Sequence, residues 1–339
     1  MSTSARTLVV APAWIGDAVL TQPLLRQLQS TRPEVPIDVL APAWTAPVFQ
    51  RMPEVTQIID SPFRHGELRL TSRYRLGKQL RARNYQQAFV LPNSVKSALL
   101  PFFARIPMRI GYVGEYRRGL LNDARALDAA AVPLMVERFA ALASAPGARL
   151  SAPLAPPQLR VAEHEASRAV AKFALDTTPG VVCLCVGAEY GPAKRWPPQY
   201  FAQLAQRLRE QGFAVWLIGS AKDKEIGEQV AAACHCVNLC GRTTLDEAIV
   251  LLSLAALVIS NDSGLMHVAA ALDRPLIALY GSSSPAFTPP LAPRARVVRI
   301  DLPCSPCFKR VCPLGHFNCM MQLLPQQVLS EAKSLRPDV

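Results

Sequence analysis

The chain has 339 residues, more than twice the length of a typical domain of about 150 residues, so a single small module is excluded. Half of the residues are hydrophobic and 18% are charged, which excludes a disordered chain. Lys and Arg outnumber Asp and Glu by 37 to 25, for a formal net charge of +12. This surplus favours an anionic partner such as a phosphate group, a nucleic acid or a membrane surface.

The start of the chain predicts a core strand rather than an export signal. Residues 8–11 are apolar, but this run is too short for a signal sequence and is followed by Pro12 and Asp17. The longest uncharged stretch, residues 275–293, contains five prolines and cannot form a continuous spanning helix. We therefore expect a cytoplasmic protein whose membrane contact, if it has one, is peripheral.

Apolar runs alternate with amphipathic stretches along the first half, a pattern that predicts a parallel sheet covered by helices. The predicted strands of this half are residues 8–11, 37–40, 57–59 and 87–91. Between the first two strands, Leu20, Leu24 and Leu28 recur on one helical face. Pro23 lies inside this pattern and should kink the helix or shorten its first turn.

A connector rich in Ala, Pro, Ser and Gly, residues 144–157, predicts a boundary between a domain of residues 1–157 and one of residues 158–339. The second half repeats the alternation, with strands at 181–186, 213–218, 257–260 and 276–280 and helices at 197–212, 224–233, 245–252 and 264–272. We therefore expect an α/β fold of two doubly wound, Rossmann-like domains facing each other across a cleft. The C-terminal segment is a candidate to pack back on the first domain.

Several familiar motifs are absent from the sequence. It contains no G-x-G-x-x-G, Walker A, G-x-S-x-G or H-E-x-x-H motif, and no Asp-x-Asp pair. These absences count against dehydrogenases, P-loop kinases, α/β-hydrolases, zincins and metal-dependent glycosyltransferases. They favour a site whose catalysis needs neither a metal nor another cofactor.

The first polar signal follows the first predicted strand. Gly16 permits a tight turn, and Asp17 stands where a helix begins. A carboxylate beside a helix N-terminus stays ionised at neutral pH and can accept a proton from a hydroxyl. The alternative for Asp17 is an ordinary N-cap.

The second signal, residues 258–267, is an apolar strand that ends in small polar residues before a helix. Such a turn offers backbone N–H groups to a diphosphate. A carboxylate would repel a phosphate, so Asp262 is expected to bind sugar or ribose hydroxyls. His267 lies one helical turn past Gly264 and is either a ligand contact or a packed core histidine.

The third signal, residues 187–197, also lies between a strand and a helix. Its cations, Lys194 and Arg195, can neutralise a diphosphate and stabilise the charge on a departing nucleotide. The alternative, stronger for Arg195, is a solvated pair of charges before a helix.

Four of the nine cysteines stand close together near the C-terminus, at Cys304, Cys307, Cys312 and Cys319, with His316 among them. Their C-x2-C-x4-C-x6-C spacing is compatible with a structural zinc site, although it matches no zinc template closely. The alternative is reduced thiols that pack a proline-containing loop.

Three segments in order, at residues 13–17, 187–197 and 261–267, resemble the signatures of the ADP-heptose:lipopolysaccharide heptosyltransferases of glycosyltransferase family 9, most closely its type II members. The resemblance implies a GT-B fold with an N-terminal acceptor domain and a C-terminal donor domain. It implies inverting transfer of L-glycero-D-manno-heptose from ADP-heptose to the first heptose of the Kdo2-lipid A inner core.

The resemblance also assigns residues. Asp17 is the catalytic base, and the donor-binding residues are Gly187, Ala188, Lys194, Ser220, Asp262, Ser263, Gly264 and His267. At Gly187 and Ala188, backbone N–H groups replace the hydroxyl groups that heptosyltransferase I presents there. Residue 221 is alanine where that enzyme has an acidic contact to adenosine, so adenosine contacts beyond Ser220 are open.

The acceptor that this resemblance implies, heptosyl-Kdo2-lipid A, is an anionic lipid on the cytosolic face of the inner membrane. Gly16, Arg64, Arg117 and Arg118 are the candidate acceptor contacts. Basic residues crowd the surrounding stretch at Arg64, His65, Arg69, Arg73, Arg75, Lys78, Arg81 and Arg83. Each cation near an anionic surface contributes about 1 kcal/mol, whereas the alternative is a solvated, Arg-rich helix face.

Other functions remain as alternatives. Heptosyltransferase I, or another family 9 enzyme with a different core acceptor, would share these motifs, and a nucleotide-sugar epimerase is a more distant possibility. A nucleic-acid module should interleave aromatic residues with its cations, but only Tyr74 and Tyr85 lie in the basic stretch. We therefore expect no nucleic-acid partner.

Overall fold

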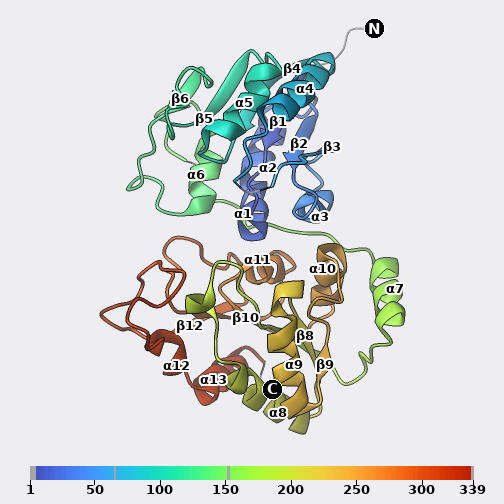
Figure 1. Ribbon diagram of the computed structural model, residues 1–339. Helices are drawn as coiled ribbons and strands as arrows, with labels where there is room; N and C mark the ends of the chain where they lie inside the picture. The colour runs from blue at the N-terminus through green and yellow to red at the C-terminus, as the bar shows by residue number, and fades with distance from the viewer. Residues whose placement is uncertain (1–4, 65, 151–152, 337–339) are drawn as a thin grey trace. The chain divides into compact units, whose positions relative to one another are not determined.

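The computed structural model describes residues 5–64, 66–150 and 153–336 (Figure 1). The chain divides into two compact units, Met1–Pro157 and Gln158–Val339, and each is described by itself. Both units contain a parallel sheet with helices, which confirms the expected α/β class.

The first unit is built on a six-stranded parallel sheet in the order β3-β2-β1-β4-β5-β6. Its strands are β1 (Arg6–Val10), β2 (Ile37–Ala41), β3 (Gln57–Asp60), β4 (Tyr85–Val90), β5 (Met108–Tyr112) and β6 (Asp123–Arg125). The order is that of dinucleotide-binding domains and reverses between β1 and β4. Loops that follow these two central strands are therefore the expected place for a ligand.

The helices of the first unit are α1 (Ile15–Leu20), α2 (Gln22–Thr31), α3 (Ala46–Gln50), α4 (Leu70–Leu80), α5 (Val95–Phe103) and α6 (Met135–Ala141), with a 3-10 turn at Arg81–Arg83. The predicted first helix is divided at Thr21, so Pro23 lies in the first turn of α2. A proline is tolerated there because first-turn N–H groups have no helical acceptor. The predicted disturbance at Pro23 is confirmed as a break between two helices.

The second unit repeats the same topology in the order β12-β11-β10-β7-β8-β9. Its strands are β7 (Val181–Cys185), β8 (Ala214–Ile218), β9 (Val237–Asn238), β10 (Leu257–Asn261), β11 (Leu276–Tyr280) and β12 (Ala295–Arg299). The order reverses between β7 and β10. These two strands are buried throughout, as central parallel strands must be.

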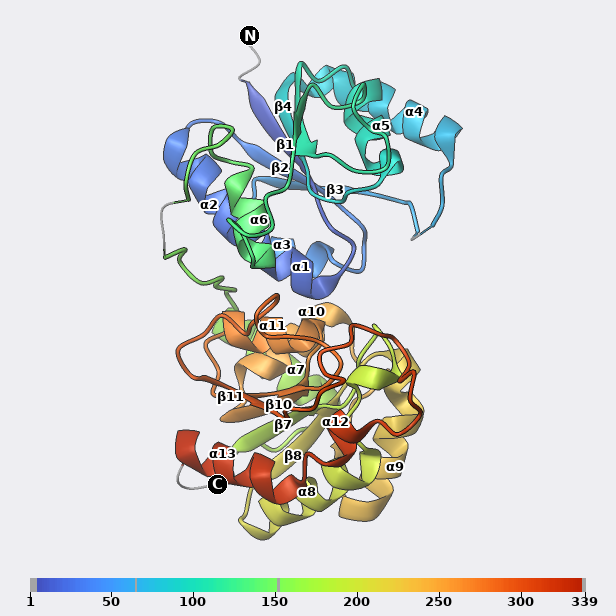
Figure 2. The same cartoon turned by 90° about the vertical axis from the view of Figure 1, so that its left-hand side faces the viewer.

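The helices of the second unit are α7 (Glu163–Phe173), α8 (Pro198–Glu210), α9 (Lys224–Cys234), α10 (Leu245–Ser253), α11 (Gly264–Ala271), α12 (Asn318–Met321) and α13 (Pro325–Leu335), with 3-10 turns η2 (Pro192–Lys194) and η3 (Ala221–Asp223). Helices α8, α9, α10 and α11 confirm the four predicted for this half, with small shifts at their ends. Helix α13 packs beside α8 (Figure 2) and adds Val328, Leu329 and Ala332 to the core. The C-terminal segment therefore belongs to the second unit.

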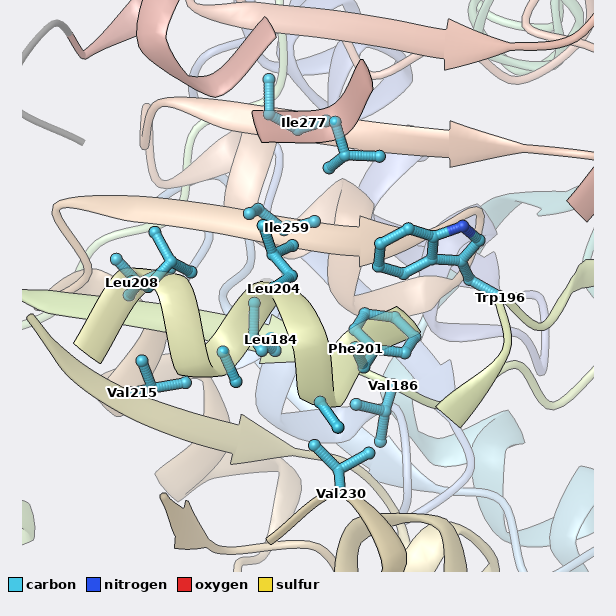
Figure 3. Close-up of a cluster of buried hydrophobic side chains, with 14 of the residues drawn as sticks. Leu184, Val186, Trp196, Phe201, Leu204, Leu208, Val215, Val230, Ile259 and Ile277 are labelled. Carbon is cyan, nitrogen blue, oxygen red and sulfur yellow. The ribbon is translucent and has the colours of Figure 1, made fainter. Parts of the chain in front are cut away.

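The inner face of α8 lies on the sheet of the second unit. Phe201, Leu204 and Leu208 point from this helix toward strand residues such as Leu184 and Ile259 (Figure 3). Each fully buried side chain of this size stabilises the fold by about 1.5–3 kcal/mol. This core anchors the strands whose ends carry the polar motifs.

Candidate active site

The reversal point of the second sheet brings two predicted motifs together. Strands β7 and β10 pair in parallel, so the segments that follow them leave the same edge of the sheet. The third sequence signal follows β7, and the second signal ends β10 and begins α11.

An ion pair joins these two motifs. Nζ of Lys194 donates to Oδ2 of Asp262 at 2.5 Å, and their side chains are 15% and 4% exposed. The hydroxyl of Ser283 donates to the same oxygen. The sequence predicted Lys194 and Asp262 as separate ligand contacts, whereas the structure pairs them. We call Lys194, Asp262 and Ser283 the donor cluster.

Ser283 was missed in the sequence. It belongs to the Gly-Ser-Ser-Ser run of residues 281–284, directly after β11, and so occupies another strand end beside β10. It lies in the uncharged stretch of residues 275–293, which the sequence analysis considers only as a possible membrane span. Its position after a predicted strand was the signal that could have identified it.

A buried asparagine holds the two strand ends in place. Nδ2 of Asn261 donates to the backbone oxygen of Val186 at 2.8 Å, and its Oδ1 accepts from the backbone N–H of Trp196 at 3.0 Å. Trp196 is itself fixed, because its Nε1 donates to the backbone oxygen of Leu323 at 2.7 Å. Asn261 therefore clamps the segment that carries Lys194 onto β10.

His267 lies beside the ion pair on α11 and is only 5% exposed. Burial lowers its pKa to about 4, an effect that Asp262 opposes and Lys194 reinforces. The imidazole is therefore neutral at pH 7. Ser263 is the N-cap residue of α11 without a side-chain cap bond, and it and Gly264 are partly exposed at the end of the helix that presents unpaired N–H groups.

Two of the remaining predicted donor residues, Gly187 and Ser220, lie against a buried carboxylate, Asp223, that was not predicted. Asp223 accepts hydrogen bonds from the backbone N–H and the hydroxyl of Ser220, at 2.9 and 2.7 Å. A Cβ at Gly187 would collide with the Asp223 carboxylate, so only glycine permits this approach. Ala188 is buried next to Gly187. The hydroxyl of Ser220 therefore donates its hydrogen bond to Asp223 in this structure.

In the first unit, Asp17 follows the central strand β1 at the reversal point of the sheet. It is the third residue of α1, and Trp14 occupies the N-cap position. The N-cap interpretation of Asp17 is therefore wrong. Asp17 and Gly16 are both partly exposed in the first turn, where the helix dipole favours an ionised carboxylate.

Two tryptophans lie next to this turn and were not predicted. Trp14 is 38% exposed and Trp44 is 43% exposed. The Nε1 of Trp44 donates to the backbone oxygen of Ala13 at 2.8 Å, which brings the loop after β2 against the loop after β1. Exposed indoles beside a carboxylate are suited to contact a sugar ring through their apolar faces.

The basic stretch of the first unit separates into two groups. Arg73, Arg81 and Arg83 are engaged with neighbouring backbone or side-chain oxygens. The exposed cations are Arg64, Arg69, Arg75 and Lys78, of which Arg69 also lies 3.9 Å from the Glu67 carboxylate. His65 lies outside the described residues. Exposed apolar side chains, Leu68, Leu70 and Tyr74, alternate with these cations. We call these four cations and three apolar residues the basic apolar face.

Arg117 is not a surface contact. It is fully buried, and its guanidinium donates to the backbone oxygens of Tyr112 and Pro92 and to the side chain of Asn93. Burial lowers its pKa to about 10. Arg117 therefore supports the loop after β4, whereas the neighbouring Arg118 is exposed.

The four C-terminal cysteines lie on the loop after β12 and on α12, and all are free thiols of intermediate exposure. Together with His316 they line one cavity. Among residues 5–64, 66–150 and 153–336, no group of three or more His, Cys, Asp or Glu side chains is placed so that it could hold a metal ion. No helix in those ranges is long and apolar enough to cross a membrane.

Two parallel sheets with this strand order, each with polar side chains at its reversal point, define an α/β protein of the nucleotide-binding class. Residues 73–318 match the model of glycosyltransferase family 9 (heptosyltransferase). The chain belongs to glycosyltransferase family 9, the family that its three motifs resemble.

Relatives that cover nearly the whole chain confirm the likeness to type II members. The chain is 48% identical to lipopolysaccharide heptosyltransferase 2 of Salmonella typhimurium and to that of Escherichia coli, over 97% of this chain and 98% of each relative. The solved structure of E. coli ADP-heptose LPS heptosyltransferase II has a TM-score of 0.88 and 46% identity, covering 97% of this chain and 98% of that one. E. coli heptosyltransferase WaaC with ADP shares the fold, with a TM-score of 0.75 and 22% identity over 97% of this chain and 99% of that one.

Proposed function

We propose that this protein is a type II lipopolysaccharide heptosyltransferase. It transfers L-glycero-D-manno-heptose from ADP-heptose to the first heptose of the Kdo2-lipid A inner core, with inversion. The observation that carries this proposal is the 48% identity, along nearly the full length, to two enzymes named heptosyltransferase 2. The residues at the reversal points of both sheets supply the chemistry that such a transfer needs.

The donor diphosphate binds at the reversal point of the second unit. Lys194 supplies a cation, and the first turn of α11 supplies backbone N–H groups and the positive end of the helix dipole. The side chain of the adjacent Arg195 is 31% exposed and offers a second cation. Asp262 lies beside Lys194 and is placed to bind a hydroxyl of the donor.

Asp17 of the first unit acts as the general base. It removes the proton from the acceptor hydroxyl, whose oxygen attacks the anomeric carbon while the bond to ADP breaks on the opposite face. One glycosidic bond forms and one breaks, and ADP carries away the bonding electrons. Lys194 stabilises the negative charge that develops on the departing diphosphate. No metal or other cofactor is required in this scheme.

The acceptor is an anionic glycolipid on the cytosolic side of the inner membrane. Trp14 and Trp44 offer apolar faces to its sugars next to Asp17. The basic apolar face offers cations to anionic headgroups and exposed apolar side chains to the membrane interface. This combination supports a peripheral contact and a cytoplasmic location, with no nucleic acid involved.

The decisive experiment is mass analysis of products formed from ADP-heptose and defined Kdo2-lipid A acceptors that carry zero, one or two heptoses. The proposal expects one heptose to be added to the acceptor that already carries one. Addition to the acceptor without heptose would instead assign heptosyltransferase I. Isomerisation of ADP-heptose in the absence of acceptor would assign an epimerase.

Membrane contact is tested by sedimentation with vesicles of phosphatidylglycerol and phosphatidylethanolamine, compared with vesicles of neutral lipid alone. Replacing Arg64, Arg69 and Arg75 by Gln should weaken binding to the anionic vesicles by roughly 3 kcal/mol, or about a hundredfold, at low salt. Equal binding of the wild type to both kinds of vesicle would contradict this assignment.

A further inference from the structure

The loop between β12 and α12 has neither regular secondary structure nor a hydrophobic core of its own. Residues 300–317 contain no helix or strand. Phe308, Val311 and Leu314 are 50%, 59% and 62% exposed, so these large apolar side chains do not build a core beneath the loop. A loop longer than about 12–15 residues without secondary structure is uncommon, and a cross-link or a metal is one way to fix the shape of a small unit that lacks a core.

The cysteines of this loop lie close enough together to supply that link. Cys304, Cys307, Cys312 and Cys319 line the same cavity. As they are placed, these four side chains do not form a ligand set that could hold a metal ion, so the thiols must turn toward one another for an ion to bind. Rotation about χ1 is the movement by which such sulfurs close on a shared ion.

The surroundings of the cavity are suited to thiolates. Ser282 also lines it, is 1% exposed, and its hydroxyl has no hydrogen-bond partner in the part of the chain that the structure describes. Metal-bound thiolates are stabilised by such donors. His316 uses its Nδ1 to accept the N–H of Asn318 at 3.0 Å, which favours a set of four thiolates.

The loop is also attached to the donor side of the second unit. The backbone N–H of Ala193 donates to the oxygen of Arg310 at 3.0 Å, and the N–H of Phe308 donates to the oxygen of Ser282 at 2.7 Å. At Gly191 any Cβ would collide with the Arg310 oxygen. The loop thus braces both segments that lead into the donor cluster.

We propose that Cys304, Cys307, Cys312 and Cys319 bind one structural metal ion, zinc or ferrous iron, as four thiolates. Soft thiolate sulfur selects these metals over magnesium or calcium, and four such ligands complete a tetrahedral site without an open position. Binding releases the thiol protons and changes no oxidation state. A disulfide joins only two sulfurs, whereas one ion accounts for four that share a cavity.

Metal content of the full-length protein, purified under reducing conditions, is the first test. Elemental analysis should find about one zinc or iron per chain in the wild type, and the metal found identifies the ion. The variant Cys304→Ser/Cys307→Ser should hold less than about a tenth of that amount, because two of four ligands are gone. The control Cys236→Ser alters a cysteine outside the cluster and should keep the metal.

A second measurement does not depend on the folding of that variant. Cobalt(II) added to wild-type protein stripped with a chelator should produce the visible absorption of tetrahedral cobalt thiolate, and zinc should displace it. Wild-type protein that holds no metal and gives no cobalt spectrum would overturn the proposal. A mass lower by the four hydrogens of two disulfides would overturn it as well.

The attachment of the loop predicts one consequence, which rests on the proposed function. Stripping the metal should weaken ADP binding by about tenfold, restored by zinc or iron, because the segments beside the donor cluster lose their brace. Metal content and ADP affinity are separate readouts. Metal bound without any ADP binding would count against the donor site and not against the metal site.

Discussion

Nζ of Lys194 lies 2.5 Å from Oδ2 of Asp262, although the two residues are 68 positions apart in the sequence. The pair is largely buried, and Asp262 both holds the lysine in place and offsets its charge. A buried pair costs desolvation energy and is weak evidence for stability alone. The position of the Lys194–Asp262 pair at the reversal point of the sheet indicates a role in ligand binding.

Loss of the cation should weaken nucleotide binding. In Lys194→Met, the Asp262 carboxylate remains without its partner and repels a diphosphate, so the affinity for ADP should fall by about 1.5–3 kcal/mol, roughly tenfold to a hundredfold. Departure of ADP should slow as well. Isothermal titration calorimetry measures the affinity and a coupled ADP assay the rate, with Lys222→Met, an exposed lysine, as control.

Loss of the carboxylate should act differently. Asp262→Asn frees Lys194 from its partner, so ADP affinity should stay within about threefold of the wild type, which is under 1 kcal/mol. Binding of ADP-heptose should weaken more than binding of ADP, because the donor hydroxyl loses its acceptor. Equal losses for both ligands in calorimetry would show that Asp262 does not contact the heptose.

The assignment of Asp17 as the general base predicts an effect on the rate of heptose transfer and no effect on the affinity for ADP-heptose. Asp17→Ala should lower the turnover of heptose transfer by about 10²–10⁴ because no group removes the acceptor proton, whereas ADP-heptose binding stays the same. The control Glu34→Gln removes an exposed carboxylate of the same unit and should leave turnover unchanged. Near-normal turnover in Asp17→Ala would exclude it as the base.

The central strands could be predicted from the sequence because parallel strands buried on both faces are continuous apolar runs. Strands β5, β6, β9 and β12 were not predicted. Strand β9 has only two residues, and the other three, Met-Arg-Ile-Gly-Tyr, Asp-Ala-Arg and Ala-Arg-Val-Val-Arg, contain arginines. All four lie toward the ends of the sheets. Their place depends on pairing with a distant neighbour, which local periodicity does not contain.

The site could be predicted in part for a similar reason. Polar residues after apolar strands mark ligand positions in a doubly wound fold, so the motifs around Asp17, Lys194 and Asp262 were found. Contacts between those motifs could not be predicted, because Ser283 and Asp223 follow the neighbouring strands β11 and β8 and reach the site only when the sheet is assembled. Arg117 was predicted as a surface contact because sequence alone does not reveal that its five donors turn inward.

The Asn261 clamp makes a prediction about stability. Asn261→Asp replaces the Nδ2 donor by an oxygen that faces the Val186 carbonyl, and it leaves a buried acceptor unsatisfied. The free energy of unfolding of the second unit should fall by about 1–3 kcal/mol. Urea denaturation followed by tryptophan fluorescence, to which the buried Trp196 and Trp216 of this unit contribute, checks this, with the exposed Gln199→Ala as control. A loss of unfolding free energy no larger than that of the control would show that the Asn261 hydrogen bonds do not stabilise the second unit.

The buried imidazole of His267 predicts how stability depends on pH. Its pKa is about 4 in the folded protein, below the ordinary value of 6.5, so between these values the unfolded chain binds more protons than the folded one. The contribution of His267 to stability is therefore complete above about pH 6.5, declines as the pH falls toward 4, and amounts to at most about 3 kcal/mol over that window.

Replacing His267 by Gln removes the titrating group while keeping a polar side chain. Urea denaturation at pH 7.5, 6 and 5 should then show a weaker loss of stability on acidification than in the wild type. The exposed His164→Gln serves as control. If wild type and His267→Gln lose stability in parallel, other groups account for the acid sensitivity, and His267 is protonated in the folded protein as readily as in the unfolded chain.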